Sequence, residues 1–359
     1  MRHANHTRTR AYIRHLCSLG FASESIMPSI LRATREIVGA DFAHFIWADE
    51  HFEIAKVYSE CPVAYATLPA YERLRRGEVA RLIGDFSDWM TFSRDFRNSS
   101  TVDQALSRSQ FYDEVLAPCH ARHFIHVVAR QGKRGWGSMI LVRESRGRQF
   151  SDTEHHAVDA LGEHIGHAIR CPLQTQGPFS DSSRSGILVV DWNGRILHQS
   201  DSTRRLLLES TDSTREYSCA KPVLAPVLRD LVMRLRYTSS RENSRPAVTE
   251  VSNRWGRFVW RAYPLDSDSG CALHCQHQEP VMLQMLTGAH IAGLSDRQQL
   301  IASRLACGAS YRQVAAEIRT KESTVTDSVR EIYLKLNVHG IDALNERLRI
   351  VYRSAQIQT

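Results

Sequence analysis

The segment from Leu294 to Leu344 constrains the fold most, because it carries the start and end signals of successive short helices. Ser295 and Gln298 have the spacing of a capping box, in which each side chain satisfies a free backbone amide of the first helical turn. Gly308 stands where a helix ends in the left-handed conformation, and Ser310 is positioned to cap a second helix. These signals predict an all-α unit that begins with two short helices.

The third helix of this unit is predicted from Glu322 to Leu336. Apolar residues recur at helical spacing along it and form its buried stripe: Val325, Val329, Ile332 and Leu336. Its outward face is polar and charged: Ser323, Thr324, Thr326, Asp327, Arg330 and Glu331. From residue 321 to residue 335, three basic side chains are balanced by three acidic ones, so the segment has no formal net charge.

Over its full length the unit resembles the LuxR/GerE-type helix-turn-helix, a four-helix DNA-binding domain. The resemblance implies that the third helix enters the major groove of double-stranded DNA, where side chains distinguish base pairs. The DNA contacts it implies are Tyr311, Arg312, Lys321, Ser323, Thr324, Thr326, Asp327, Arg330 and Lys335. It also implies a homodimer through the final helix, whose apolar stripe is Leu344, Leu348 and Val351.

Two positions of the third helix depart from the family pattern, which typically has a lysine where Thr326 stands and a histidine where Ser328 stands. Asp327 would either repel a phosphate or accept a hydrogen bond from a cytosine amino group. The favoured function is a sequence-specific transcription regulator. The alternative is a sensory or scaffolding protein whose C-terminal helices bind a protein partner, with little affinity for DNA. A steep loss of DNA affinity with salt would distinguish the two.

Breaks in composition divide the chain into several domains. A stretch rich in Pro, Gly, Ser, Gln and Thr predicts a linker, and four arginines before the first acidic residue, Glu24, predict an exposed basic arm. The expected order is a basic arm and helix at 1–19, an α+β unit at 20–170, the linker at 171–185, a second α+β unit at 186–278, a connector at 279–293 and the all-α domain at 294–359.

Residues 20–170 resemble a GAF domain, most closely in GSMILVRESRGRQFSDTEHHAVDALGEHIGHAI, where Ser151 and Glu154 have capping-box spacing. The resemblance implies an α+β sensory fold whose cup holds a small-molecule ligand. The cover of this cup is expected between Asp85 and Tyr112, a stretch rich in aromatics: Phe86, Trp89, Phe92, Phe96, Phe111 and Tyr112. Core packing explains these aromatics as well as a ligand does.

Residues 186–278 begin with two strand-like runs joined at Asn193-Gly194, which predicts a hairpin. Two helical segments and three further strand-like runs follow. This order resembles a degenerate α+β PAS domain. The chain as a whole is therefore expected to be multidomain, with GAF-like and PAS-like input domains that control a helix-turn-helix output.

Composition is compatible with this interpretation. Lys and Arg number 46 against 39 Asp and Glu, and the net charge of +7 suits a polyanionic partner such as DNA. No apolar run reaches the roughly 18–20 residues of a membrane span, and the N-terminus lacks a signal-peptide pattern, so a cytoplasmic protein is expected. The eight cysteines are expected to be reduced thiols. No catalytic constellation or metal-ligand set stands out, so neither an enzyme nor a cofactor is expected.

Overall fold

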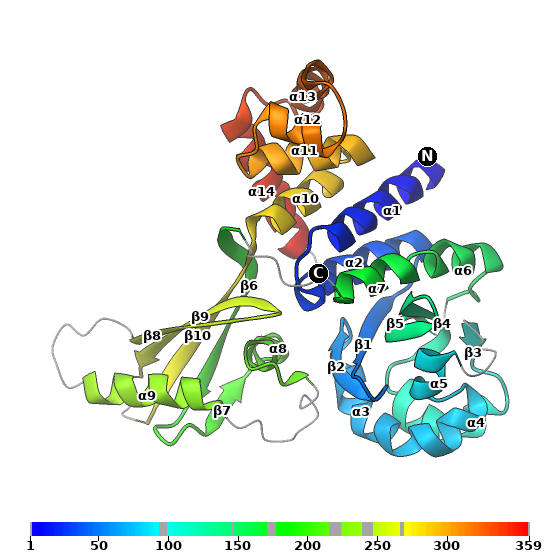
Figure 1. The fold of residues 1–359 in the computed structure, drawn as a ribbon. Helices are drawn as coiled ribbons and strands as arrows, with labels where there is room; N and C mark the ends of the chain where they lie inside the picture. The colour runs from blue at the N-terminus through cyan, green and yellow to red at the C-terminus, as the bar shows by residue number, and fades with distance from the viewer. Residues whose placement is uncertain are drawn as a thin grey trace.

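The computed structural model describes residues 2–92, 99–144, 147–170, 177–214, 224–238, 247–265 and 269–357. These residues form two sheet-containing units and one helical unit (Figure 1). The two sheet-containing units lie side by side, and the helical unit, coloured orange to red, lies above them. No helix in the described part of the chain is long and apolar enough to cross a membrane.

The first unit is an antiparallel sheet with helices on both faces. Its elements are α1 (Arg2–Ser18), α2 (Ser23–Val38), β1 (Phe42–Ala48), β2 (Ile54–Ser59), α3 (Pro62–Leu74), η1 (Arg75–Val79), α4 (Ala80–Leu82), α5 (Phe86–Thr91), β3 (Ser99–Thr101), η2 (Leu106–Arg108), η3 (Tyr112–Leu116), β4 (Ala121–Gln131), β5 (Arg134–Glu144), α6 (Asp152–Asp159) and α7 (Gly162–Arg170). The sheet order is β2-β1-β5-β4-β3.

The first sheet separates two cores because successive side chains of a strand point to opposite faces. On β1, Phe45 and Trp47 lie in the core shared with α2 and α7. Phe42 and Ile46 lie in the core shared with α3 and α5. His44, between them, lines a cavity on the second face. Side chains therefore pack against both faces of the sheet, and the second face also borders a cavity.

The segment that follows Ser151 forms two helices, α6 and α7. The predicted capping box of Ser151 and Glu154 begins α6. On α7, a Cβ at Gly162 would lie 2.4 Å from the Val128 carbonyl oxygen, and one at Gly166 would lie 2.2 Å from that of Arg130. The break between the helices thus brings α7 onto the backbone of β4, at a distance that only glycine allows.

The second unit contains the predicted hairpin, two helices and three further strands. Its elements are β6 (Phe179–Val190), β7 (Ile196–Gln199), α8 (Asp201–Ser210), α9 (Pro226–Thr238), β8 (Ala247–Asn253), β9 (Gly256–Pro264) and β10 (Cys271–Pro280). The sheet order is β7-β6-β10-β9-β8, and Gly194 has the positive φ of 79° that the hairpin turn requires. Both sheets thus share one order: second, first, fifth, fourth and third strand.

Strand β6 begins inside the stretch expected to be a linker. Phe179 pairs with Pro280 and Ser180 with Glu279, so β10 extends β6 toward its N-terminus. Residues 171–176 of the expected linker lie outside the described residues. The polar composition did not reveal this extension because its pairing partner is far away in the sequence.

The C-terminal unit is all-α, as predicted. Its helices are α10 (Val281–Ile291), α11 (Asp296–Ala306), α12 (Tyr311–Glu317), α13 (Glu322–Leu336) and α14 (Ile341–Ile357). Capping boxes begin α11 at Ser295 and α12 at Ser310. The stretch expected as a connector, 279–293, is mostly α10, which contributes Val281, Met285 and Ala289 to the core of this unit.

The N-terminal segment is not the exposed basic arm expected from its arginines. It forms α1, whose side chains Ala11, Tyr12, Ile13 and Leu16 are buried. This helix packs on α2 and α7 of the first unit and on α10 and α11 of the C-terminal unit. The segment is ordered because its apolar side chains pack against helices of both units.

Candidate nucleic-acid interface

Helices α12 and α13 form a compact helix-turn-helix at the end of the C-terminal unit that points away from both sheets (Figure 1). Ser310 caps α12 by accepting a hydrogen bond from the Gln313 backbone amide, at 3.3 Å. Val314 of α12 packs in the same core as Val325 and Val329 of α13. This packing confirms the predicted buried stripe and leaves the opposite face of α13 on the surface.

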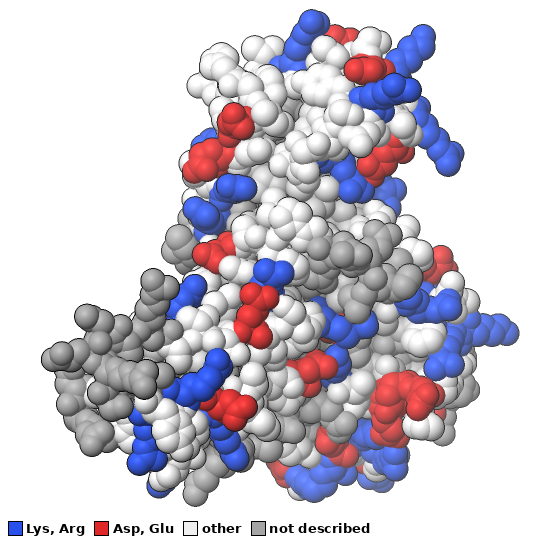
Figure 2. All heavy atoms as spheres, turned by 60° about the vertical axis from the view of Figure 1, so that its left-hand side comes forward, with Lys and Arg blue, Asp and Glu red and all other residues white. Residues whose placement is uncertain are grey.

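Six of the nine residues expected to contact DNA have exposed side chains. Those with exposed side chains are Arg312, Lys321, Ser323, Asp327, Arg330 and Lys335, and those partly buried are Tyr311, Thr324 and Thr326. Thr326 donates a hydrogen bond to the Glu322 backbone carbonyl at 3.1 Å. Basic and acidic side chains are interspersed over this end of the molecule (Figure 2).

Several charges of α13 pair locally. Arg330 Nη1 lies 3.3 Å from Asp327 Oδ1, with both side chains about two-thirds or more exposed (74% and 69%). Lys335 Nζ donates a hydrogen bond to the Gly293 carbonyl oxygen at 2.6 Å, so this lysine reaches back to the turn between α10 and α11. Since exposed pairs contribute only about 0–1 kcal/mol, the Arg330–Asp327 pair can separate when a stronger partner arrives.

Two surface residues near this region escaped the sequence analysis. Arg319 is exposed in the turn between α12 and α13, where its φ of 53° is the left-handed conformation. Leu334 is 83% exposed on α13. The spacing of Leu334 relative to the stripe at Ile332 and Leu336 already indicated an outward position, but a leucine does not signal a DNA contact.

The stripe expected to form a homodimer is buried within this single chain. Leu344 and Leu348 of α14 are fully buried in the core that includes α10, and Val351 is partly buried. Helices α10 and α14 cross so closely that a Cβ at Gly288 would lie 2.4 Å from the Leu348 carbonyl oxygen. A dimer through Leu344 and Leu348 therefore requires α14 to separate from α10.

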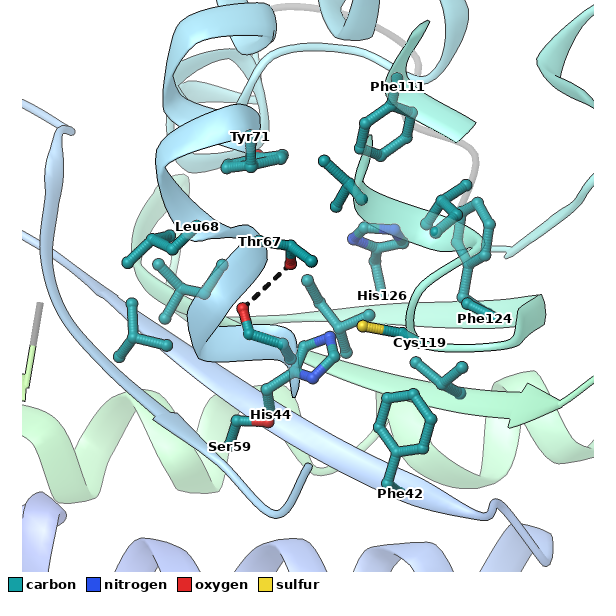
Figure 3. Close-up of a pocket in the computed structure, with 18 of the residues that line it drawn as sticks. Phe42, His44, Ser59, Thr67, Leu68, Tyr71, Phe111, Cys119, Phe124 and His126 are labelled. Carbon is teal, nitrogen blue, oxygen red and sulfur yellow. Dashed lines mark hydrogen bonds between the residues drawn. The ribbon is translucent and has the colours of Figure 1, made fainter. Parts of the chain in front are cut away.

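A second candidate site is a cavity of about 100 Å³ in the first unit, between the sheet and α3 (Figure 3). His44 of β1 and His126 of β4 line it among mainly apolar side chains. Burial lowers the pKa of His44 to about 4 and that of His126 to about 3, so both imidazoles are neutral near pH 7. His44 Nδ1 and Tyr71 Oη find no hydrogen-bond partner among the described residues.

The aromatic stretch expected to cover the cavity does so in part. Trp89 and Phe111 line the cavity, and Phe86 is buried beside it in the same core. Phe92 is 37% exposed, and Phe96 lies outside the described residues. Among the described residues, no group of three His, Cys, Asp or Glu side chains could hold a metal ion.

Comparison with known proteins identifies the C-terminal unit. Residues 292–345 match the GerE family, described as bacterial regulatory proteins of the luxR family. A chain of the solved structure titled "Crystal structure of the phage VqmA-DPO complex" is similar at 13% identity over 49% of this chain and 89% of that chain, with a TM-score of 0.21. No curated protein matches the chain. The chain thus carries a luxR-type helix-turn-helix, which is the DNA-binding domain of transcription regulators.

Proposed function

We propose that this protein is a sequence-specific transcription regulator of the cytoplasm, in which two sensory units control a luxR-type helix-turn-helix. The observation that carries the proposal is the position of α13. Within a segment that matches the luxR family, its polar face is exposed, and the helix lies at the end of the C-terminal unit that is farthest from both sheets. A helix so placed is free to enter a major groove without rearrangement of the sensory units.

The proposed DNA contacts have different roles. Arg312, Arg319 and Lys321 are exposed cations around the start of α13, suited to phosphate oxygens and to fixing the register. Arg330 is proposed to recognise a guanine. Its guanidinium can separate from Asp327 and donate two hydrogen bonds to the O6 and N7 acceptors of one guanine edge. Leu334 is suited to an apolar contact with a thymine methyl group.

The two sheet-containing units are the proposed sensors, the first GAF-like and the second PAS-like. Their common strand order and the cavity of the first unit support this assignment. The ligand proposed for the cavity is small, uncharged and mainly apolar, because both imidazoles that line it are neutral. It carries one hydrogen-bonding group, which would satisfy His44 Nδ1 or Tyr71 Oη. An aromatic ring is roughly the right size.

A route from the sensors to the output runs through α10. Strand β10 ends at Pro280, and α10 begins at the next residue. Tyr352 of α14 donates a 2.5 Å hydrogen bond to the partly buried Glu279 carboxylate near the end of β10. Because α10 covers Leu348, a shift of β10 would alter how much of the α14 stripe is available for the proposed homodimer.

A protein partner is the second candidate for this surface. The exposed Leu334 and the Arg330–Asp327 pair favour it, since an apolar side chain and a locally neutralised arginine suit a protein interface. This alternative predicts little attraction of α13 to phosphates.

Salt dependence separates the two candidates. The full-length chain is titrated with a labelled random-sequence duplex at several salt concentrations, and binding is followed by fluorescence anisotropy. A DNA-binding regulator gives a log–log slope of about −0.9 for each phosphate contacted, so several contacts produce a steep line. A DNA affinity that does not change with salt, or no DNA binding at low salt, would favour the protein-partner function over DNA binding.

A further inference from the structure

Helix α1 carries several arginines and no acidic residue. The first acidic residue of the chain, Glu24, comes after this helix has ended at Ser18. One face of α1 is buried against α2, α7 and α10, and Arg10 and Arg14 are exposed on the remaining face, about one helical turn apart. The buried face therefore holds the helix in place, and the remaining face presents positive charge to solvent.

Two contacts place α1 beside the helix-turn-helix. Arg14 Nη2 lies 3.4 Å from Asp296 Oδ2 in the first turn of α11, and both side chains are about half exposed. Arg8 Nη1 donates a hydrogen bond to the Gly293 carbonyl oxygen at 3.4 Å, and the same oxygen accepts a hydrogen bond from Lys335 of α13. A cation of α1 and a cation of α13 therefore meet at one turn of the chain.

Helix α11 connects α1 to α13. Arg297 in its first turn is exposed, and Gln298 Nε2 donates a hydrogen bond to Glu331 Oε2 of α13 at 3.2 Å. The cations on these three helices form one surface, the basic flank, which consists of Arg8, Arg10, Arg14, Arg297 and Lys335. The carboxylates of Asp296 and Glu331 lie within the basic flank and offset part of its charge.

The charge of the basic flank contrasts with that of the helix expected to read the bases. Residues 321–335 have no formal net charge, and Arg330 of α13 pairs with Asp327. Attraction to DNA comes mainly from Lys and Arg side chains that neutralise phosphates, and such contacts also fix the orientation of a protein on the duplex. A DNA-binding protein whose base-reading helix is neutral needs these cations beside that helix.

We propose that the basic flank binds phosphates of the DNA adjacent to the site that α13 reads. This inference rests on the proposed DNA-binding function and adds a contact from outside the helix-turn-helix. Arg10 and Arg14 supply the phosphate contacts of α1, and Arg14 can separate from Asp296 because an exposed ion pair contributes little to stability. Since α1 also packs on α2 and α7, this contact orients the first unit against the duplex.

The experiment compares the full-length chain with its Arg10→Gln and Arg14→Gln variants. Binding to a labelled duplex of three helical turns, roughly 30 base pairs, is followed by fluorescence anisotropy across a salt series. Each substitution is expected to make the log–log salt slope shallower by about 0.9, the loss of one phosphate contact. The matched control is Arg81→Gln, at an exposed arginine of α4, which lies at the end of the first unit remote from α1 (Figure 1). This control is expected to keep the wild-type slope.

Asp296→Asn gives a second measurement of opposite sign. The substitution removes a negative charge from the basic flank and frees Arg14, while the amide oxygen can still form a hydrogen bond with His15. We expect stronger DNA binding and a steeper slope, with folding checked by circular dichroism. A steep wild-type slope that all three α1 and α11 variants share would overturn the basic flank and leave the proposed function standing. A wild-type chain without salt-dependent DNA binding would overturn both.

Discussion

The Tyr12 hydroxyl of α1 lies 2.8 Å from the Thr287 hydroxyl of α10, and the Tyr12 ring stacks on His290 with ring centroids 4.2 Å apart. Beside this contact, Arg14 and His15 pair with Asp296 at the start of α11, at 3.4 and 2.6 Å. Helix α1 also packs on α2 and α7. The N-terminal helix therefore joins the first unit to the DNA-binding unit through buried and surface contacts together.

Tyr12→Phe tests the contribution of this contact to stability. The substitution keeps the stacked ring but leaves the buried Thr287 hydroxyl with one partner fewer, so we expect the free energy of unfolding to fall by about 1 kcal/mol. Urea denaturation measures the change. The matched control is Tyr263→Phe at an exposed tyrosine, expected to stay within about 0.5 kcal/mol of wild type. Equal losses in both variants would contradict a special role for Tyr12.

Buried neutral histidines predict acid sensitivity. Burial lowers the pKa of four of them to about 4 or about 3: His44, His126, His277 and His290. The unfolded chain, with histidine pKa values near 6.5, binds more protons than the folded chain below that pH. The contribution of these neutral histidines to the free energy of unfolding is therefore complete above pH 6.5. It falls as the pH drops toward 4, by about 2 kcal/mol for each histidine at pH 5.

The pH dependence of unfolding between pH 7 and pH 5 measures this effect. His290→Gln should reduce the proton uptake on unfolding by about one. His339→Gln, at an exposed histidine, is the control and should leave the pH dependence unchanged. A His290→Gln protein with the wild-type pH dependence would show that His290 does not contribute.

Fragments of the C-terminal unit test the role of α10. Residues 279–359 retain the helix that covers Leu344 and Leu348, whereas residues 292–359 lack it. We expect the shorter fragment to self-associate at micromolar concentration, because it exposes an apolar stripe, and the longer one to sediment as a monomer. Identical masses for the two fragments would contradict the view that α10 masks a dimer surface.

Local sequence signals predicted the elements well. The capping boxes at Ser151 and Ser295, the hairpin at Gly194 and the stripe from Val325 to Leu336 all lie where their spacing indicated. Each of these features depends on residues within a few positions of one another. For the same reason the helix-turn-helix was predictable from its own residues.

Contacts between distant segments were not predictable. The arginines of α1 indicated a solvated arm. The residues near Tyr12 in the sequence give no sign that Tyr12 contacts Thr287 and His290. The family resemblance implied that Leu348 lies on a dimer surface, and nothing near it in the sequence indicated its packing against α10. In each case the deciding partner lies in another element.

The most direct test of the central claim changes the charge at the exposed face of α13. Asp327→Lys replaces the partner of Arg330 with a cation, and Arg330→Ala removes the proposed guanine reader. Arg122→Ala, at an exposed arginine of the first unit, is the matched control. All three are compared with wild type by anisotropy on a labelled duplex across a salt series.

If α13 lies against DNA, Asp327→Lys strengthens non-specific binding and steepens the log–log salt slope by about one for each phosphate newly contacted. Arg330→Ala weakens binding and relaxes sequence preference by about 1–3 kcal/mol at one base pair, while Arg122→Ala changes neither. Unchanged affinity and slope in both α13 variants, with the domain still folded by circular dichroism, would contradict groove entry by α13.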